Sequence, residues 1–197
     1  MQHLKEQVRG KIIEAGRAEF MAKGFSGASM REIAERAGVV AGNVYRYFPG
    51  KDALFEAIVG PAHKSLLSLV KANSRVDRNA VNDFRAIEPT VELLLEACHT
   101  YRAELSLLAD GSAGTRYANT REELVAHIER RLALGLLSRG NGGKKGEDSF
   151  ILHVMAATFI DGFLMILREQ GLDSRVRDRS VRRLLALFFK DLKARLT

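Results

Sequence analysis

Cysteine is nearly absent from this chain of 197 residues, in which Cys98 stands alone. A single thiol cannot close a disulfide within the chain, and it cannot supply the ligand set of a structural zinc site or an iron–sulfur cluster. Residues 1–9 are polar and charged, so they also lack the apolar core of a secretory signal. These absences exclude disulfide scaffolds and zinc fingers, and they predict a cytoplasmic protein.

Long apolar runs and strand patterns are also scarce. The most apolar stretch, residues 150–167, contains His153 and Asp161 and is shorter than the ~20 apolar residues of a membrane-spanning helix. Alternation with a period of two is rare, whereas apolar residues recur at the spacing i, i+3, i+4, i+7. We therefore expect an all-α protein outside the membrane. Its expected helices cover residues 4–23, 30–37, 41–48, 51–72, 88–101, 102–110, 117–139, 150–170 and 177–196, with a loop over 73–82 and a joint at Pro61 in the fourth helix.

Motifs of enzymes are missing as well. The five histidines form no His-Glu-x-x-His pattern, and the chain has neither a Gly-x-Ser-x-Gly elbow nor a second cysteine. The glycine-rich segment 138–146 lacks the Gly-x-x-x-x-Gly-Lys-Ser/Thr form of a phosphate loop, which favours a linker. The sequence thus predicts no enzyme, no metal site and no cofactor.

The most informative segment is residues 24–50. Gly24 is expected to end the first helix, and Ser29-Met30-Arg31-Glu32 has the form of a capping box that starts the next. This second helix is only two turns long and ends at Gly38, and a third short helix over 41–48 is stopped by Pro49-Gly50. Two short helices joined by a tight turn have the spacing of a helix-turn-helix motif.

Side chains in and near the third helix suit DNA. The chain has 31 Lys+Arg against 24 Asp+Glu, a net charge of +7 that favours a polyanionic partner. On a helix in the major groove, Asn43 can pair with adenine and Arg46 with guanine, or either can bind a phosphate, while Val44 and Phe48 face the core. The candidate DNA-binding residues are Arg31, Ala41, Gly42, Asn43, Tyr45, Arg46, Tyr47 and Lys51: the small pair permits close approach, and the tyrosines, the lysine and Arg31 suit phosphate oxygens.

Residues 11–58 closely resemble the N-terminal DNA-binding domain of the TetR family of bacterial transcriptional regulators. The resemblance rests on Ser29–Ala34, Ala37–Val39, Val44–Phe48 and Lys51. The chain departs from the family pattern at Val40, where a small polar residue is usual, and at Asn43, where Thr is frequent. Asp161-Gly162 also resembles a pair often found in the family's penultimate long helix. The resemblance implies a DNA-binding domain over 1–51, with phosphate contacts by Tyr45, Tyr47 and Lys51, followed by a helical ligand-binding and dimerisation domain over 52–197.

The two last helices are expected to form a dimer. Apolar residues surround helix 150–170 on every side, which predicts burial on all sides, and helix 177–196 adds an apolar stripe. Two copies joined through this pair would make a four-helix interface and would place two recognition helices on one operator.

The expected function is a homodimeric repressor that a small molecule releases from double-stranded operator DNA by shifting helix 51–72 about Pro61. The effector is unknown, and the candidate residues that bind it are His99, Tyr101, His127, His153, Met155 and Phe159. The alternative is a helical ligand-binding or scaffold protein whose helix-turn-helix mediates protein contacts.

Overall fold

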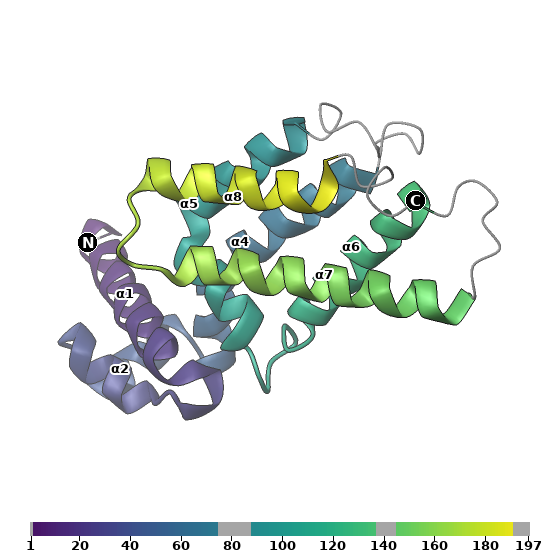
Figure 1. Cartoon of the computed structure of the whole chain (residues 1–197). Helices are drawn as coiled ribbons and strands as arrows, with labels where there is room; N and C mark the ends of the chain where they lie inside the picture. Colours follow the sequence, from purple (N-terminus) through teal and green to yellow (C-terminus); the bar gives the residue numbers. More distant parts are fainter. Residues whose placement is uncertain (1, 75–87, 137–144, 191–197) are drawn as a thin grey trace. The chain divides into compact units, whose positions relative to one another are not determined.

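The computed structural model describes residues 2–74, 88–136 and 145–190, and all its regular elements in those ranges are helices (Figure 1). The all-α prediction is thereby confirmed. The helices are α1 (Gln2–Gly27), α2 (Met30–Ala37), α3 (Ala41–Tyr47), α4 (Lys51–Ser74), α5 (Glu88–Asp110), α6 (Thr120–Leu136), α7 (Lys145–Arg168) and α8 (Ser174–Phe189). The expected loop beyond residue 74, most of the glycine-rich linker and the end of the last helix lie outside the described residues.

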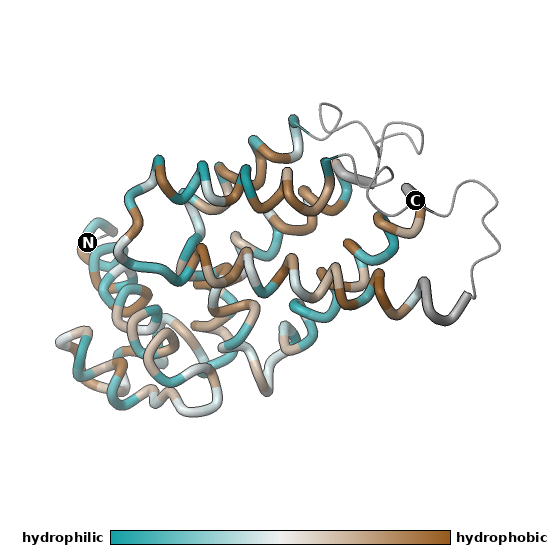
Figure 2. Tube along the Cα trace, in the orientation of Figure 1, coloured by the Kyte–Doolittle hydropathy of each residue, from teal (hydrophilic) through white to brown (hydrophobic). Residues whose placement is uncertain are grey.

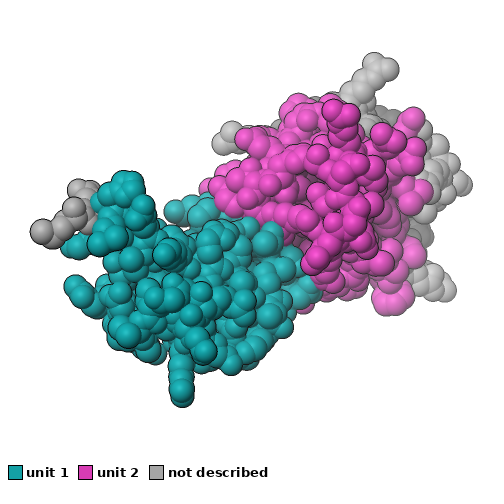
Figure 3. Space-filling view, turned by 90° about the vertical axis from the view of Figure 1, so that its left-hand side faces the viewer, with its two compact units in different colours: residues 1–64, 103–119 teal, residues 65–102, 120–197 magenta. Residues whose placement is uncertain are grey.

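The chain divides into two compact units (Figure 3). Unit 1 is drawn from residues 1–64 and 103–119, and unit 2 from residues 65–102 and 120–197. Helices α4 and α5 each contribute residues to both units. The first turns of α4 and the segment 103–119 join unit 1.

An aromatic cluster forms the centre of unit 1. The ring centroid of Phe55 lies 5.0 Å from that of Phe20 and 5.2 Å from that of Phe25, in edge-to-face geometry. All three side chains are buried, and Ile33 of α2 and Val44 of α3 are fully buried as well. Helices as short as α2 and α3 are marginal by themselves, so burial of Ile33 and Val44 stabilises them. Each buried aromatic or aliphatic side chain contributes about 1.5–3 kcal/mol of transfer free energy.

The ends of α1 and α2 follow the expected glycines. Gly24 has φ +66° and ψ 175°, so the regular part of α1 stops there, although one more turn reaches Gly27. Gly38 has φ +69° and ψ 33°, and its N–H donates to the carbonyl of Glu35. This left-handed conformation costs a residue with a Cβ about 1–2 kcal/mol, which is why glycine ends α2.

The expected capping box is wrong. Ser29 does precede α2 in an extended conformation, but its side chain makes no capping hydrogen bond. The Glu32 carboxylate instead binds the Lys23 ammonium of α1 at 2.5 Å. Because the Glu32 carboxylate is paired with Lys23 of α1, it does not accept the hydrogen bond from the Ser29 amide that a capping box requires.

Two other helix boundaries differ from expectation. Helix α4 continues through Pro61 to Ser74, so the joint expected at Pro61 is not a break that divides the helix. Helices expected over 88–101 and 102–110 are one element, α5, with a non-helical residue at Tyr101 (φ −127°, ψ 29°). The expected end at residue 101 is therefore a kink.

Segment 103–119 is tied to the end of α1 and to α4 within unit 1. The Phe25 N–H donates to the Gly111 carbonyl at 2.8 Å, and the Ser26 hydroxyl donates to the Ala113 carbonyl at 2.9 Å. The buried Tyr117 donates its hydroxyl to the Glu56 carboxylate of α4. Burial and this hydrogen bond raise the pKa of Tyr117, so the phenol stays protonated.

Unit 2 is built on α7, which packs against α6 and α8. Phe159 of α7 contacts Phe163 and the rings of Phe188 and Phe189 on α8. Arg102 of α5 donates to the carbonyls of residues 167, 168 and 169 at the carboxyl end of α7. This guanidinium supplies donors for carbonyls that the helix itself leaves unpaired.

One face of α7 is exposed, which corrects the expectation that this helix is buried on all sides. Ile151, Val154 and Met165 lie on the exposed face, and Met165 is 70% exposed. Figure 2 shows that hydrophobic residues follow α7 along its length. By length and composition alone, residues 51–72 and 149–168 could each span a membrane, yet both carry buried faces that pack inside the protein.

Candidate nucleic-acid interface and candidate pocket

Helix α3 is held by one face and open on the other. Val44 and Phe48 are buried in unit 1, as expected. At about 100° per residue, Gly42 and Arg46 lie on the opposite face from Val44. Ala41, Gly42, Tyr45 and Arg46 are exposed, whereas Asn43 and Tyr47 are half-buried at the edges. The structure therefore presents small, aromatic and cationic side chains together on a helix that fits a groove of DNA.

Close approach to α3 is unobstructed. A Cβ built on Gly42 would meet no protein atom within 4 Å. The side chain of Val40, the residue before α3, makes no capping hydrogen bond, as its apolar nature requires. Tyr45 is 51% exposed, so about half of its surface is open to a partner.

Acidic groups near α2 are neutralised by basic ones. The Glu19 carboxylate, 1% exposed, lies 2.9 Å from the Lys23 ammonium and 3.5 Å from the Arg36 guanidinium. The hydrogen bond from Lys23 is the main cause that lowers the pKa of Glu19. Arg31 at the start of α2 is exposed, and no ion pair with it occurs in the described part of the chain. Its positive charge is thus available to a partner.

Lys51 takes a different position from the other predicted DNA-binding residues. Its ammonium lies 3.1 Å from the Ala28 carbonyl and 3.3 Å from the Ser26 carbonyl, and 4.6 Å from the centre of the Phe25 ring. Lys51 therefore ties the start of α4 to the connection between α1 and α2. The third N–H of its ammonium is the one left for a phosphate.

Arg9 of α1 is a basic residue beside α3 that sequence reasoning missed. Its guanidinium carbon lies 5.5 Å from the centroid of the Phe48 ring. Phe48 directly follows Tyr47, the last residue of α3. The sequence shows the charge of Arg9 but not its neighbour, because the tertiary structure determines that it meets Phe48, 39 residues further along the chain.

The candidate effector residues occupy separate places in unit 2. His99 of α5 lies 3.0–3.1 Å from the carboxylate of Asp178 on α8, and His153 of α7 lies 3.0 Å from Glu129 on α6. Both histidines are exposed. His127 is buried on α6, and burial lowers its pKa. The remaining candidates are Tyr101 at the kink of α5, the half-buried Met155, and Phe159 in its cluster of rings.

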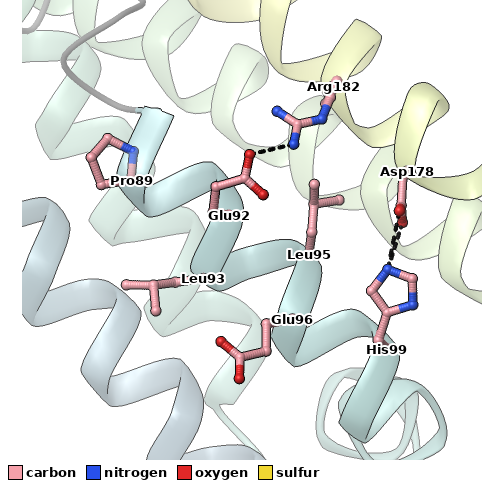
Figure 4. A pocket seen from close by; sticks show the side chains of 8 residues that line it. All are labelled: Pro89, Glu92, Leu93, Leu95, Glu96, His99, Asp178 and Arg182. Atoms are coloured by element: carbon pink, nitrogen blue, oxygen red, sulfur yellow. Dashed lines mark hydrogen bonds and ion pairs between the residues drawn. The ribbon is translucent and has the colours of Figure 1, made fainter.

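An open hollow of about 770 Å³ lies between α5 and α8 (Figure 4). His99 is the one candidate effector residue that lines it. Arg182 crosses the hollow to bind the carboxylates of Glu88 and Glu92. Figure 4 shows that both ion pairs, Arg182–Glu92 and His99–Asp178, join the two helices. The hollow is lined by Pro89, Glu92, Leu93, Leu95, Glu96, His99, Asp178 and Arg182.

Comparison with known proteins agrees with this geometry. A family model described as "Bacterial regulatory proteins, tetR family" matches residues 12–58. The chain is 36% identical over 66 residues to the HTH-type transcriptional regulator Rv1816 of Mycobacterium tuberculosis, 45% over 56 residues to the probable HTH-type transcriptional regulator YttP of Bacillus subtilis, and 32% over 72 residues to the HTH-type transcriptional regulator TtgR of Pseudomonas putida. These matches cover 34%, 28% and 36% of this chain. They span 28%, 27% and 34% of the relatives' own lengths, about a quarter to a third.

Solved structures share the whole fold. NalD of Pseudomonas aeruginosa, described as the secondary repressor of the MexAB-OprM multidrug efflux pump, has a TM-score of 0.55 at 23% identity, covering 96% of this chain and 97% of that one. A transcriptional regulator from Aquifex aeolicus has a TM-score of 0.57 at 19% identity, covering 92% and 99%. Residues 12–58 thus match the tetR family of bacterial regulatory proteins, and the solved structures share the fold of the chain as a whole.

Proposed function

We propose that the protein is a sequence-specific DNA-binding transcriptional regulator, a homodimeric repressor that a small molecule releases from its operator. The observation that carries the proposal is the orientation of α3, whose buried Val44 and Phe48 leave Gly42, Tyr45 and Arg46 facing outward. The curated relatives matched over this region are described as HTH-type transcriptional regulators, and NalD is described as a repressor. We infer that it acts in the cytoplasm, where bacterial DNA lies.

Recognition of the operator divides between base edges and phosphates. Arg46 and Asn43 carry the donors that read guanine and adenine edges in the major groove, and the small residues Ala41 and Gly42 admit the duplex close to the helix. Tyr45, Tyr47, Arg31 and the remaining N–H of Lys51 suit phosphate oxygens, which set the register of the helix without reading sequence. The protein would thus combine direct readout by α3 with backbone contacts around it.

The dimer forms through α7 and α8 in this proposal. Ile151, Val154 and Met165 are exposed apolar side chains on one face of α7, which also carries the exposed Thr158 and Asp161, and Leu187 of α8 is 58% exposed. A Cβ built on Gly162 would be 3.4 Å from Leu184 of α8, so α7 and α8 are close at this point. Covering the exposed apolar side chains with a two-fold copy buries apolar area that one chain leaves in water. Residues 150–170 and the described part of 177–196 therefore supply the proposed interface.

The effector is assigned to residues 52–197, with the DNA-binding domain over 1–51. Of the six candidate effector residues, His99 lines the hollow between α5 and α8. Phe159 and His127 belong to buried packing, and His153 to a surface ion pair. We therefore propose His99 as the first of the six candidates to contact the effector. A substitution of His99 is the first one to test in an inducer screen.

The test is a DNA-binding titration of the full-length protein at several salt concentrations. The probe is a duplex that the protein itself enriches from a random library, with a scrambled duplex as the competitor. A dimer that neutralises roughly four to eight phosphates gives a log–log salt slope of about −4 to −7. We expect saturable binding that prefers the enriched duplex.

Two matched variants complete the test. Arg46→Ala removes an exposed arginine from α3 and should abolish the preference for the enriched duplex, whereas Arg130→Ala removes an exposed arginine from α6 and should preserve it. If no duplex is enriched and no salt-dependent binding occurs, the helix-turn-helix would serve protein contacts in a ligand-binding or scaffold protein.

A further inference from the structure

The first turns of α1 extend beyond the core of unit 1. Ile12, Ala15 and Phe20 are buried, but in residues 3–11 every side chain is exposed except the half-buried Val8. Isolated helices shorter than about 12–15 residues are marginally stable in water. The first turns of α1 are stable because they continue a longer helix whose later turns pack in the core. These first turns are thus held in place while their surface stays open.

Two basic residues on these turns face the side on which α3 and α4 lie. At about 100° per residue, Lys5 and Arg9 fall within about 40° of each other and of Gly16. Gly16 marks this side, because a Cβ built on it would lie 3.0 Å from the Leu54 side chain of α4. Arg9 reaches Phe48 from the same side.

The contact with Phe48 orients the Arg9 guanidinium without using its hydrogen-bond donors. An arginine above an aromatic ring is attracted to the ring's π-electrons, and this contact is not one of the hydrogen bonds that its five N–H donors can make to another partner. In the part of the chain that the structure describes, neither Arg9 nor Lys5 forms an ion pair, and both are exposed. An oriented guanidinium whose donors the ring contact does not use is suited to bind a phosphate in bidentate fashion.

We propose that Arg9, supported by Lys5, is a second DNA contact: it binds the phosphodiester backbone beside the groove that α3 enters. This inference rests on the proposed function and adds to it a contact from α1, outside the helix-turn-helix. The contact complements Lys51, whose ammonium already donates to the carbonyls of Ser26 and Ala28. Because it touches only the backbone, it contributes affinity but no sequence preference.

The test measures salt-dependent binding of full-length variants to the enriched duplex and to the scrambled duplex. Arg9→Gln should weaken binding to both duplexes by the same factor, about tenfold. Each protomer of a dimer would lose one phosphate contact, so the log–log salt slope should become shallower by about 1.8. Arg9→Lys keeps the charge and should retain most of the slope.

The chain offers a matched control on the same helix. Lys11 is exposed and lies about 200° around α1 from Arg9, so it faces away from α3. Lys11→Gln removes the same charge and should leave the salt slope at its wild-type value. If Lys11→Gln changed the slope as much as Arg9→Gln, the effect would belong to net charge and the proposal would be overturned.

A purely structural role for Arg9 gives a different result. Loss of packing on Phe48 would lower the thermal midpoint and the affinity while the salt slope stayed constant, which would refute a phosphate contact. Failure of the wild-type protein to bind any duplex would remove the proposed function and this contact together. Wild-type binding with an unchanged slope in Arg9→Gln would remove only the contact.

Discussion

Replacement of Gly42 by alanine should make the protein more stable and a weaker DNA binder at the same time. A Cβ at this position meets no protein atom within 4 Å, and Gly42 is not among the glycines with positive φ. The added methyl group therefore causes no clash and no backbone strain. Alanine is favoured over glycine inside a helix by about 0.5–1 kcal/mol. For a chain of this length, that gain raises the thermal midpoint by about 1–4 °C.

The same methyl group should obstruct DNA. It projects from the face of α3 opposite Val44, where the proposed interface requires close approach to the base edges. We expect the affinity for the enriched duplex to fall at least tenfold, a loss of about 1.4 kcal/mol. The assays are thermal unfolding and fluorescence anisotropy on the same preparation.

Gly10→Ala is the matched control, because Gly10 also lies in a helix with nothing within 4 Å of its built Cβ. It should give the same stabilisation with unchanged DNA affinity. Equal affinity of Gly42→Ala and wild type would refute the assignment of this face of α3 to DNA.

Four further outcomes follow from particular contacts. Gly38→Ala should lower the free energy of unfolding by about 1 kcal/mol although nothing lies within 4 Å, since φ is +69° there; stabilisation in a denaturant titration would contradict this. Met165→Glu should convert the dimer into a folded monomer in sedimentation equilibrium, because this exposed side chain belongs to the proposed interface. Lys23 lowers the pKa of Glu19 below its ordinary 4.5, so this stabilisation is complete above about pH 4.5 and is lost as the pH falls through the folded-state pKa; the acid limb of a stability profile should flatten in Glu19→Gln. Burial raises the pKa of Cys98 to about 12, so the native protein should resist iodoacetamide at pH 8, and rapid labelling without denaturant would show that the thiol is accessible.

Short-range signals allowed the DNA-binding region to be predicted from the sequence alone. Gly38 ends α2 because a left-handed residue is needed there, and Pro49-Gly50 follows the end of α3 because neither residue continues a helix. The helical period separates the buried Val44 and Phe48 from the exposed Arg46. These features depend on neighbours within a few residues, so the sequence by itself determined them.

Contacts between residues far apart in the sequence explain the features that the sequence patterns predicted wrongly or did not predict. Glu32 fits a capping box in sequence, but the ammonium of Lys23 on another helix binds its carboxylate. Segment 103–119 joins unit 1 through hydrogen bonds to Phe25, Ser26 and Glu56, which no local pattern announces. The six candidate effector-binding residues are of types that suit a pocket. They lie apart because helices α5, α6 and α7 place them at different positions in unit 2.

The same reason explains α7 and the basic residues around α3. An all-round apolar helix predicts burial, but a single chain covers only the faces turned to α6 and α8, and Met165 remains exposed. Lys51 and Arg9 carry equal charges in the sequence. Tertiary packing alone decided that Lys51 donates to the chain's own carbonyls and that Arg9 lies over Phe48, because the partners of both are at least 23 residues away.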